Sequence, residues 1–350
     1  MSAVNAASVA SGPPPGTSQK VVVAGKGGPE VLELVRVDVP EPRRGQVRLR
    51  VAAAGVAFGD VMRRRGVLAP LGRYTPGYDV AGSVDAVGPG GDATLVGRRA
   101  AVLMPTPGVG GYAEHVCVPA ARLVLVPDGV DIVETLALGL NYITAYQLLE
   151  RLVPLAPGAR VLVHGAAGGV GTALLDLGRR RGLTLYGTAS AGKHELVRSY
   201  GATPIDYRSE DFVARTRELS GGAGVDAVFD PIGGAHLVRS NETLRAGGTL
   251  VSFGASGDLD RGLRGVLGGV ASYLRLKLRA DGRRRLMYLI TLTRGTGWRH
   301  CRDDWAALLA LRERGEVHPL VGARIPFAEV RRAHQLIDTA AVSGKVVLEM

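Results

Sequence analysis

The segment VHGAAGGVG, residues 163–171, constrains the fold of this chain more than any other feature. The apolar run VLVHG that leads into it is typical of a buried parallel strand, and the following TALLDLGRRRG has a helical pattern of leucines. A second apolar run, LTLYGTAS, is typical of another strand. Strand, glycine turn, helix and strand in this order predict a βαβ unit of a doubly wound α/β domain.

Small residues occupy the positions of this turn at which the backbone must come close to a ligand. Ala166, Gly168 and Gly171 stand at the three small-residue positions of the dinucleotide-binding fingerprint, with alanine in place of the first glycine. A pyrophosphate at such a turn binds backbone N–H groups at the helix N-terminus, which side chains would obstruct. We therefore expect a Rossmann domain whose cofactor contacts include these three residues together with Gly169 and Val170.

The end of the second strand indicates which dinucleotide binds. A site for NAD usually carries Asp or Glu here, which binds the ribose hydroxyls and repels a 2′-phosphate. This chain has Ser190 and Lys193 instead, and a hydroxyl with an ammonium group can hold a phosphate dianion. We therefore predict NADPH as the cofactor, although a solvated lysine at a helix start is the plain alternative for Lys193. Tyr207 and Arg208, after the third apolar segment, are expected to flank the adenine and to add a second cation.

Composition agrees with such a protein. The chain has 350 residues, enough for two cores, and its 46% hydrophobic and 5% aromatic content is typical of an α/β protein built on aliphatic strands. A net charge of +11 is compatible with binding to nucleic acid or anionic membranes. However, no zinc-finger, RNA-recognition or basic-zipper motif is present, and an arginine-rich composition with an anionic cofactor explains the charge. We expect no nucleic-acid partner.

Cysteine usage and the N-terminus predict the compartment. Cys117 and Cys301 are the only cysteines, and they lack the paired spacing of a disulfide framework or a structural zinc site. No apolar stretch is long enough to span a bilayer. Residues 1–19 lack the charged start and the apolar core of a signal peptide, so we expect a disordered tail there. Together these features predict a cytoplasmic protein.

The remaining chain divides into two expected domains. Short apolar runs separated by Gly and Pro over residues 20–136 are typical of a compact β-barrel-like domain, and residues 137–314 are expected to form the nucleotide-binding domain. Residues 315–350 have the pattern strand, helix, strand and are expected to return to the first domain and complete it. The basic segment 258–302 is expected to supply the last nucleotide-domain elements with a lid or dimer edge. Contact of this segment with anionic lipid is a minor alternative.

Four further motifs carry a family resemblance: LNYITAYQLLE, GTASAGKHE, TPIDYRSEDFV and FDPIGG. With them the chain is similar to the zinc-free quinone oxidoreductases of the medium-chain dehydrogenase/reductase superfamily, especially the vesicle amine transport protein homologues. The resemblance covers nearly the whole chain after the tail. It implies an α/β fold in which a GroES-like β-barrel catalytic domain accompanies the doubly wound parallel sheet of the Rossmann domain, and it implies a homodimer.

The resemblance also bears on metal chemistry. A catalytic zinc in this superfamily needs three protein ligands, typically two cysteines and a histidine. The matching positions here are Ala57, Tyr78 and Leu140, and the four-cysteine lobe of the structural zinc is missing. We therefore expect no metal ligands. Without a Lewis acid, the expected reaction is hydride transfer from NADPH to an acceptor that is already electrophilic, either a quinone or a conjugated double bond.

The matching motifs also predict the residues of the cleft. The candidate acid–base residues are Asp60, Tyr78 and Tyr142. Local capping by Asp60 and packing by the tyrosines are the plain alternatives. The residues expected to contact the substrate are Phe58, Met62 and Asn141. The further cofactor contacts that the resemblance implies are Thr144, Phe253, Gly254 and Lys345.

Two departures from the family leave other functions open. Ala57 stands where quinone reductases commonly carry Asn, and the tyrosine that enoyl reductases use after the position of Asp60 is absent, with Tyr74 the nearest one. An enoyl reductase of a biosynthetic pathway and a non-catalytic NADPH-binding scaffold or redox sensor therefore remain alternatives. His164, just before the turn, is expected to be a core histidine with satisfied hydrogen bonds.

Overall fold

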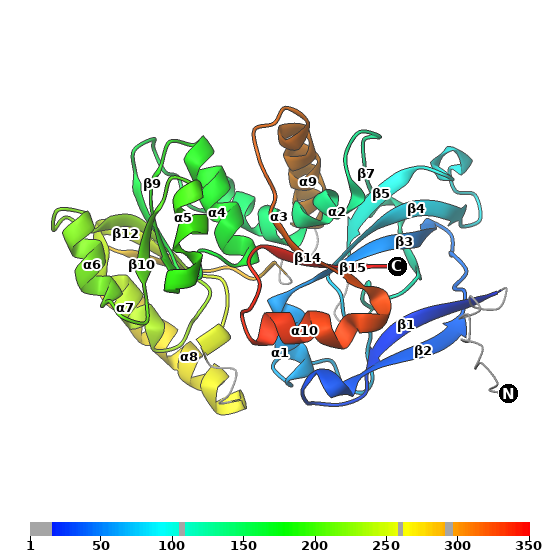
Figure 1. The fold of residues 1–350 in the computed structure, drawn as a ribbon, viewed down its shortest axis with the longest axis horizontal. Helices are drawn as coiled ribbons and strands as arrows, with labels where there is room; N and C mark the ends of the chain where they lie inside the picture. The colour runs from blue at the N-terminus through cyan, green and yellow to red at the C-terminus, as the bar shows by residue number, and fades with distance from the viewer. Residues whose placement is uncertain (1–15, 105–108, 258–261, 291–296) are drawn as a thin grey trace, which may run out of the picture.

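The structure is a computed structural model and describes residues 16–104, 109–257, 262–290 and 297–350. Figure 1 shows two lobes, one built on a parallel sheet covered by helices and the other on antiparallel strands, with α2, α3 and α9 between them. The doubly wound parallel sheet and the separate β-barrel-like domain expected from the sequence are both confirmed.

A six-stranded parallel sheet forms the nucleotide lobe. Its strands, in spatial order, are β10 (Thr203–Asp206), β9 (Thr184–Ala189), β8 (Arg160–Val163), β11 (Val225–Asp230), β12 (Leu244–Ser252) and β13 (Arg284–Met287). The direction of winding reverses between β8 and β11. The carboxyl ends of these two strands therefore form the topological switch point, at which sheets of this kind bind ligands.

Helices cover both faces of this sheet. The helices on one face are α3 (Leu140–Tyr146), α4 (Gly169–Arg180) and α5 (His194–Ser199), and those on the other are α6 (Phe212–Leu219), α7 (His236–Glu242) and α8 (Gly262–Lys277). Val161 and Val163 of β8 pack in the cluster that contains α4, whereas Leu162 packs in the cluster of the opposite face. Because successive strand residues alternate between faces, burial of both faces makes β8 apolar throughout.

Two sheets form the other lobe. Strand β1 (Thr17–Val23) pairs antiparallel with β2 (Leu32–Asp38). The larger sheet has, in spatial order, β14 (Val321–Pro326), β15 (Lys345–Glu349), β3 (Gln46–Val56), β4 (Asp79–Val87), β5 (Arg99–Leu103) and β7 (Val124–Leu125), and β6 (His115–Pro119) also pairs with β3. Side chains of both sheets, among them Val21, Leu32 and Leu49, share one core, as in a barrel.

The expected N-terminal tail is too long by three residues. Residues 17–19 belong to β1, where they pair with residues 36–38 of β2. The main-chain hydrogen bonds of this pairing, together with the bond from the Gln19 N–H to a Glu114 carboxylate oxygen (2.7 Å), order the start of the strand. Residues 1–15 of the expected tail lie outside the described residues.

The remaining helices are α1 (Phe58–Arg64), α2 (Ile132–Ala137), α9 (Gly297–Glu313) and α10 (Val330–Asp338). Of these, α2 and α9 lie between the lobes, and α1 and α10 pack on the β-rich lobe (Figure 1). Helix α3 continues into a π-helical segment, Gln147–Leu152, and buried Trp305 of α9 donates its indole N–H to the Thr135 carbonyl of α2 (3.2 Å). Strand β15 pairs with β3, so the C-terminal segment belongs to the larger sheet of the β-rich lobe.

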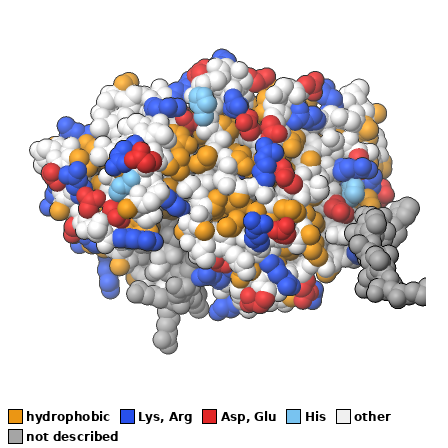
Figure 2. Space-filling view, viewed as in Figure 1, with side chains coloured by type: hydrophobic (Ala, Val, Ile, Leu, Met, Phe, Trp, Pro, Cys, Tyr) orange, Lys and Arg blue, Asp and Glu red, His pale blue; other side chains and the backbone are white. Residues whose placement is uncertain are grey.

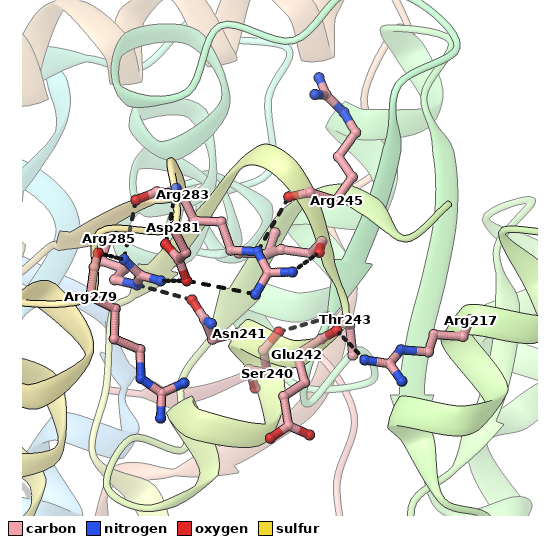
Figure 3. Close-up of polar contacts among 11 residues, drawn as sticks. Arg217, Ser240, Asn241, Glu242, Thr243, Arg245, Arg279, Asp281, Arg283 and Arg285 are labelled. Carbon is pink, nitrogen blue, oxygen red and sulfur yellow. Dashed lines mark hydrogen bonds and ion pairs between the residues drawn. The ribbon is translucent and has the colours of Figure 1, made fainter. Parts of the chain in front are cut away.

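Arginines of the basic segment hold the edge of the nucleotide lobe together (Figure 3). Arg285 is buried on β13, donates to Asn241 Oδ1 of α7 (3.0 Å) and forms an ion pair with Asp281. Arg283 donates from Nη2 to the Leu244 carbonyl (2.7 Å). These two arginines therefore serve internal contacts between α7, β12 and β13. The described part of segment 258–302 forms α8, β13 and the start of α9.

The surface charges are interspersed. On the face shown in Figure 2, basic and acidic side chains alternate around the molecule, and apolar side chains gather between the two lobes. Among the described residues, this face therefore shows no single basic patch of the kind that marks a nucleic-acid-binding surface. Within the described ranges, no helix has both the length and the apolar character needed to cross a bilayer.

His334 of α10 provides a prediction about stability. Its ring is buried, with Nε2 3.3 Å from the Tyr112 hydroxyl, and burial lowers its pKa to about 3. The folded protein therefore holds this ring neutral, whereas an unfolded histidine binds a proton near pH 6.5. Its contribution to stability is complete above pH 6.5 and is lost as the pH falls toward 3, by about 4–5 kcal/mol over the whole window.

We expect His334→Gln to flatten this dependence. Urea unfolding followed by circular dichroism at several pH values between 6.5 and 4 measures it, and the variant should lose less stability than the unmodified protein. His300→Gln is the matched control, because His300 is exposed. Parallel curves for His334→Gln and the unmodified protein would contradict the prediction.

Candidate functional site

The glycine turn between β8 and α4 lies at the switch point of the sheet. Gly165 adopts a left-handed conformation (φ 63°), and its carbonyl accepts the N–H of Gly168 (2.9 Å), which precedes the helix in an extended conformation. The first N–H groups of a helix have no acceptor within the helix. Those of Gly169, Val170 and Gly171 are therefore available to an anion at the N-terminus of α4.

Close packing explains the small residues of this turn. A Cβ on Gly171 would lie 2.2 Å from the Gly165 carbonyl oxygen, and one on Gly169 would lie 2.2 Å from Asn141 Nδ2. Ala166 is buried, and its N–H donates to the Thr188 carbonyl of β9 (3.0 Å). The structure thus brings the predicted fingerprint residues and Asn141 together at one helix end.

The loop between α10 and β15 lies against this turn. The Gly344 N–H donates to the Ala167 carbonyl (3.2 Å). Beyond β9, Lys193 Nζ donates to the carbonyls of Ala340 (2.8 Å) and Val342 (3.1 Å) in the same loop, and burial lowers the pKa of Lys193. The loop therefore joins the C-terminal segment to both ends of the predicted dinucleotide site.

The residues predicted at the adenosine end surround the ends of β9 and β10. The Ser190 carbonyl accepts the Lys193 N–H (2.8 Å) in a short 3₁₀ turn. Tyr207 is 53% exposed, and the Arg208 guanidinium lies 5.8 Å from the centre of its ring. An ammonium group has three donors, so Lys193 keeps one for a phosphate oxygen. The residues present therefore fit NADPH. The two loop carbonyls that also bind Lys193 could not be found from the sequence.

The Lys345 side chain points away from the turn, contrary to the prediction. It is 1% exposed, and its Nζ lies 3.0 and 2.9 Å from the two carboxylate oxygens of buried Asp79 on β4. Asp79 Oδ2 also accepts the N–H of Leu140, at the start of α3 (3.0 Å). Lys345 therefore neutralises a buried carboxylate that positions α3, and it adds no charge at the phosphates.

Tyr142 also points out of the cleft, so its prediction as an acid–base residue is wrong. Its buried hydroxyl donates to Asp176 Oδ2 of α4 (2.8 Å), and the same oxygen accepts the His318 N–H (2.7 Å). Burial, followed by the nearby Asp176 carboxylate, raises the pKa of Tyr142 well above its usual value. Tyr142 joins α3 to α4, which is the packing alternative.

Asp60 serves as a local cap. Its buried carboxylate accepts the N–H groups of Ala57 (3.0 Å) and Gly77 (2.8 Å) and lies 3.3 Å from the Tyr112 hydroxyl. Burial raises the pKa of Asp60 to about 6. These contacts hold the N-terminus of α1 to the segment before β4, so the structure favours the capping alternative over proton transfer.

Of the three predicted acid–base residues, Tyr78 is the one that is still a candidate, and it lies beside α1. Its hydroxyl packs against Gly59, where a Cβ would come within 2.5 Å of the oxygen, and the Arg63 guanidinium lies 4.5 Å from its ring centre. Burial raises the pKa of Tyr78 above its usual value. Phe58 and Met62, on the same helix, are half-buried. Three of the predicted acceptor-site residues are thus held around α1.

Arg63 is a site residue that the sequence motifs did not predict. In the run of three arginines, Arg64 and Arg65 both form ion pairs with Asp338 (2.6 Å each), whereas Arg63 covers Tyr78. A guanidinium over an aromatic face is a recognised stabilising contact. The run of three arginines was visible in the sequence, but only the structure shows which of them lies at the site.

The remaining predicted residues lie on α3 and directly after β12. Thr144 is buried, and its hydroxyl donates to the Leu140 carbonyl one helical turn earlier (2.7 Å), while Phe253 and Gly254 follow β12 and are half-buried. The three positions that match zinc ligands, Ala57, Tyr78 and Leu140, belong to or pack on one apolar cluster. The alanine and leucine side chains offer no atom that could bind a metal.

Comparisons with known proteins agree with this architecture. A family described as alcohol dehydrogenase GroES-like domain matches residues 43–128, and one described as zinc-binding dehydrogenase matches residues 200–348. The chain is 36% identical over 341 residues to a synaptic vesicle membrane protein VAT-1 homolog of Rattus norvegicus, covering 94% of this chain and 83% of that protein. It is 33% identical to a 2-haloacrylate reductase of Burkholderia sp, covering 93% and 97%.

A solved structure extends the likeness to three dimensions. The crystal structure of Escherichia coli quinone oxidoreductase complexed with NADPH matches with a TM-score of 0.82 and 26% identity, covering 95% of this chain and 100% of that chain. The GroES-like character expected for the β-rich lobe is confirmed.

Proposed function

Because the chain belongs to the medium-chain dehydrogenase/reductase superfamily, we propose that it is an NADPH-dependent oxidoreductase that reduces a quinone or a conjugated double bond. The observation that carries the proposal is the turn before α4, whose backbone N–H groups are unobstructed by side chains and which has Lys193, not a carboxylate, at the end of the next strand. The names of the Escherichia coli and Burkholderia relatives support the two acceptor classes.

The chain's own residues divide the binding of this cofactor. NADPH supplies the hydride when it is bound. The first turn of α4 binds the pyrophosphate, and Ser190 and Lys193 bind the 2′-phosphate. The residues that flank the adenine are Tyr207 and Arg208, and those that border the nicotinamide end are Thr144, Phe253 and Gly254.

The acceptor end is formed by three half-buried side chains and one buried amide. Phe58, Met62, Tyr78 and Asn141 position a flat acceptor and exclude water. Two of the three positions that match zinc ligands, Ala57 and Leu140, carry no metal-binding atom. We therefore propose chemistry without zinc and an acceptor that is already electrophilic. Because Tyr142 is bound to Asp176, the proton that completes the reduction comes from Tyr78 or from solvent.

Oxidation of NADPH by the purified protein tests the proposal, with NADH as a control and ortho-quinones, para-quinones, conjugated enones and 2-haloacrylate as acceptors. Turnover with quinones alone supports a quinone reductase. Turnover with enones alone indicates an enoyl reductase of a biosynthetic pathway. Absence of turnover with retained NADPH binding indicates a scaffold or redox sensor and overturns the proposal.

Lys193→Ala is expected to weaken NADPH binding by about 10–100-fold while NADH binding changes little. A hydrogen bond to a charged group contributes about 1.5–3 kcal/mol, and only NADPH carries the 2′-phosphate. Titration of each cofactor, followed by nicotinamide fluorescence, measures both dissociation constants.

Lys277→Ala removes one exposed positive charge from α8 and serves as the control for net charge. Equal losses of both cofactors in Lys193→Ala would show that Lys193 acts only through its bonds to Ala340 and Val342, and they would reject the phosphate contact.

We further propose a homodimer that forms at the β13 edge of the parallel sheet. In the part of the chain that the structure describes, β13 pairs only with β12, and the adjacent α8 exposes Leu267, Val270 and Leu274 along one side. Unpaired strand edges and exposed apolar stripes favour association.

A further inference from the structure

Three metal-ligating side chains meet in the nucleotide lobe, away from the superfamily's zinc positions. His164 directly follows β8, Asp230 ends β11 and His236 begins α7. One ligand atom from each residue lies within 4.8 Å of the others. We propose that these residues bind a divalent metal ion of the zinc type, with the Ser240 hydroxyl as the fourth ligand. The proposal departs from the sequence-based expectation that the chain carries no metal ligands.

The four ligand atoms lie close together, and four of the six distances between them are short. Ser240 Oγ lies 2.6 Å from Asp230 Oδ2, 3.1 Å from His164 Nε2 and 3.2 Å from His236 Nδ1, and the last atom lies 2.8 Å from Asp230 Oδ2. Tetrahedral zinc with bonds of about 2.0–2.1 Å separates its ligands by about 3.3 Å. Binding therefore requires these four edges to open by less than about 1 Å.

The side chains themselves also suit a metal. The cluster supplies two imidazoles and one carboxylate. A neutral imidazole and an ionised carboxylate are the forms that bind metals.

Outer contacts orient the ligands before a metal binds. His164 Nδ1 lies 3.1 Å from Thr188 Oγ1, as expected for a ligating histidine whose second nitrogen is held in place. Asp230 Oδ1 accepts the N–H groups of Ile232 (2.7 Å) and Gly233 (3.0 Å), which leaves Oδ2 for the metal. The His236 side chain is 22% exposed and provides a route from solvent.

A hydrogen-bond network without metal is the competing explanation. It differs from the metal site in the position of one proton, on the His164 ring. The single Ser240 hydrogen is donated to Asp230 Oδ2, so without metal His164 must carry its proton on Nε2 to bond Ser240. With metal, His164 Nε2 offers its lone pair, and the proton lies on Nδ1 toward Thr188. The two states are therefore distinct tautomers of His164.

The test uses the full chain without cofactor, after treatment with a chelator. Calorimetric titration with Zn²⁺ is expected to show one equivalent bound, and Co²⁺ is expected to give the visible spectrum of a tetrahedral site. ¹⁵N NMR is expected to show the His164 proton move from Nε2 to Nδ1. His236→Ala should lower Zn²⁺ affinity by more than the roughly 10–100-fold that loss of an outer-shell partner causes.

His115→Ala is the matched control, because His115 lies 3.7 Å from a single carboxylate, Asp85, and 3.1 Å from a serine hydroxyl, Ser18 Oγ. The His115→Ala variant should bind Zn²⁺ with the same affinity as the unmodified protein. Absence of stoichiometric Zn²⁺ binding, equal effects of the two variants, or an unchanged His164 tautomer would each overturn the proposal in favour of the hydrogen-bond network. These readouts do not depend on turnover, so the result stands apart from the proposed reductase activity.

Discussion

Lys345→Met is expected to lower the free energy of unfolding by about 3–5 kcal/mol. The ammonium group of Lys345 and the carboxylate of Asp79 are both buried and lie 2.9–3.0 Å apart. Removal of the lysine leaves a buried carboxylate without a counter-ion, which is the costly way to break such a pair. Urea denaturation followed by circular dichroism at pH 7 measures the change.

The double variant Asp79→Asn/Lys345→Met separates this cause from simple loss of packing. Asparagine keeps an oxygen for the Leu140 N–H but carries no charge, so the double variant should recover most of the lost stability. Lys277→Met, at an exposed lysine, should leave stability nearly unchanged. A Lys345→Met protein within about 1 kcal/mol of the unmodified one would contradict the expectation, since that range is typical of an exposed ion pair.

Gly171→Val is expected to weaken NADPH binding by at least about 100-fold, because loss of two hydrogen bonds from the turn to the charged pyrophosphate removes about 3–6 kcal/mol. The added Cβ would lie 2.2 Å from the Gly165 carbonyl oxygen and 2.8 Å from backbone atoms of Ala166. Backbone atoms cannot rotate away as a side chain can, so α4 must move from β8. Fluorescence titration with NADPH measures the affinity, and circular dichroism shows whether the fold persists.

Gly171→Ala is the milder second variant, and it should show the same direction of change if valine prevents folding. Gly192→Ala serves as the control, because a Cβ there meets open space and the residue lies in the turn after β9. Unchanged NADPH affinity in Gly171→Ala would show that the turn tolerates a side chain and would remove the main support for the cofactor site.

Much of the fold was predictable because its signals are local. The apolar run of β8 and the leucines of α4 have the periodicities of a buried strand and an amphipathic helix. The start of β1 was missed because Thr17, Ser18 and Gln19 carry little apolar signal, and their order comes from pairing with β2.

The predicted catalytic residues were harder to place because side-chain direction depends on distant partners. Asp60 reaches Gly77 and Tyr112, and Tyr142 reaches Asp176, 34 residues away. The motifs identified the correct segments but not the direction in which each side chain points. The same limit hid the cluster of His164, Asp230 and His236. His164 follows β8 and Asp230 ends β11, and these two strands are adjacent only in the folded sheet.

The sequence by itself determined the order of elements, the glycine turn and the absence of a carboxylate after β9, because spacing and residue size act over a few neighbouring positions. Only the tertiary structure decided what the charged and hydroxyl groups do. Lys345 and Asp79 stand 266 residues apart in the chain, yet burial brings their charges together. Buried polar groups must find partners wherever the fold supplies them, and those partners cannot be read from local sequence.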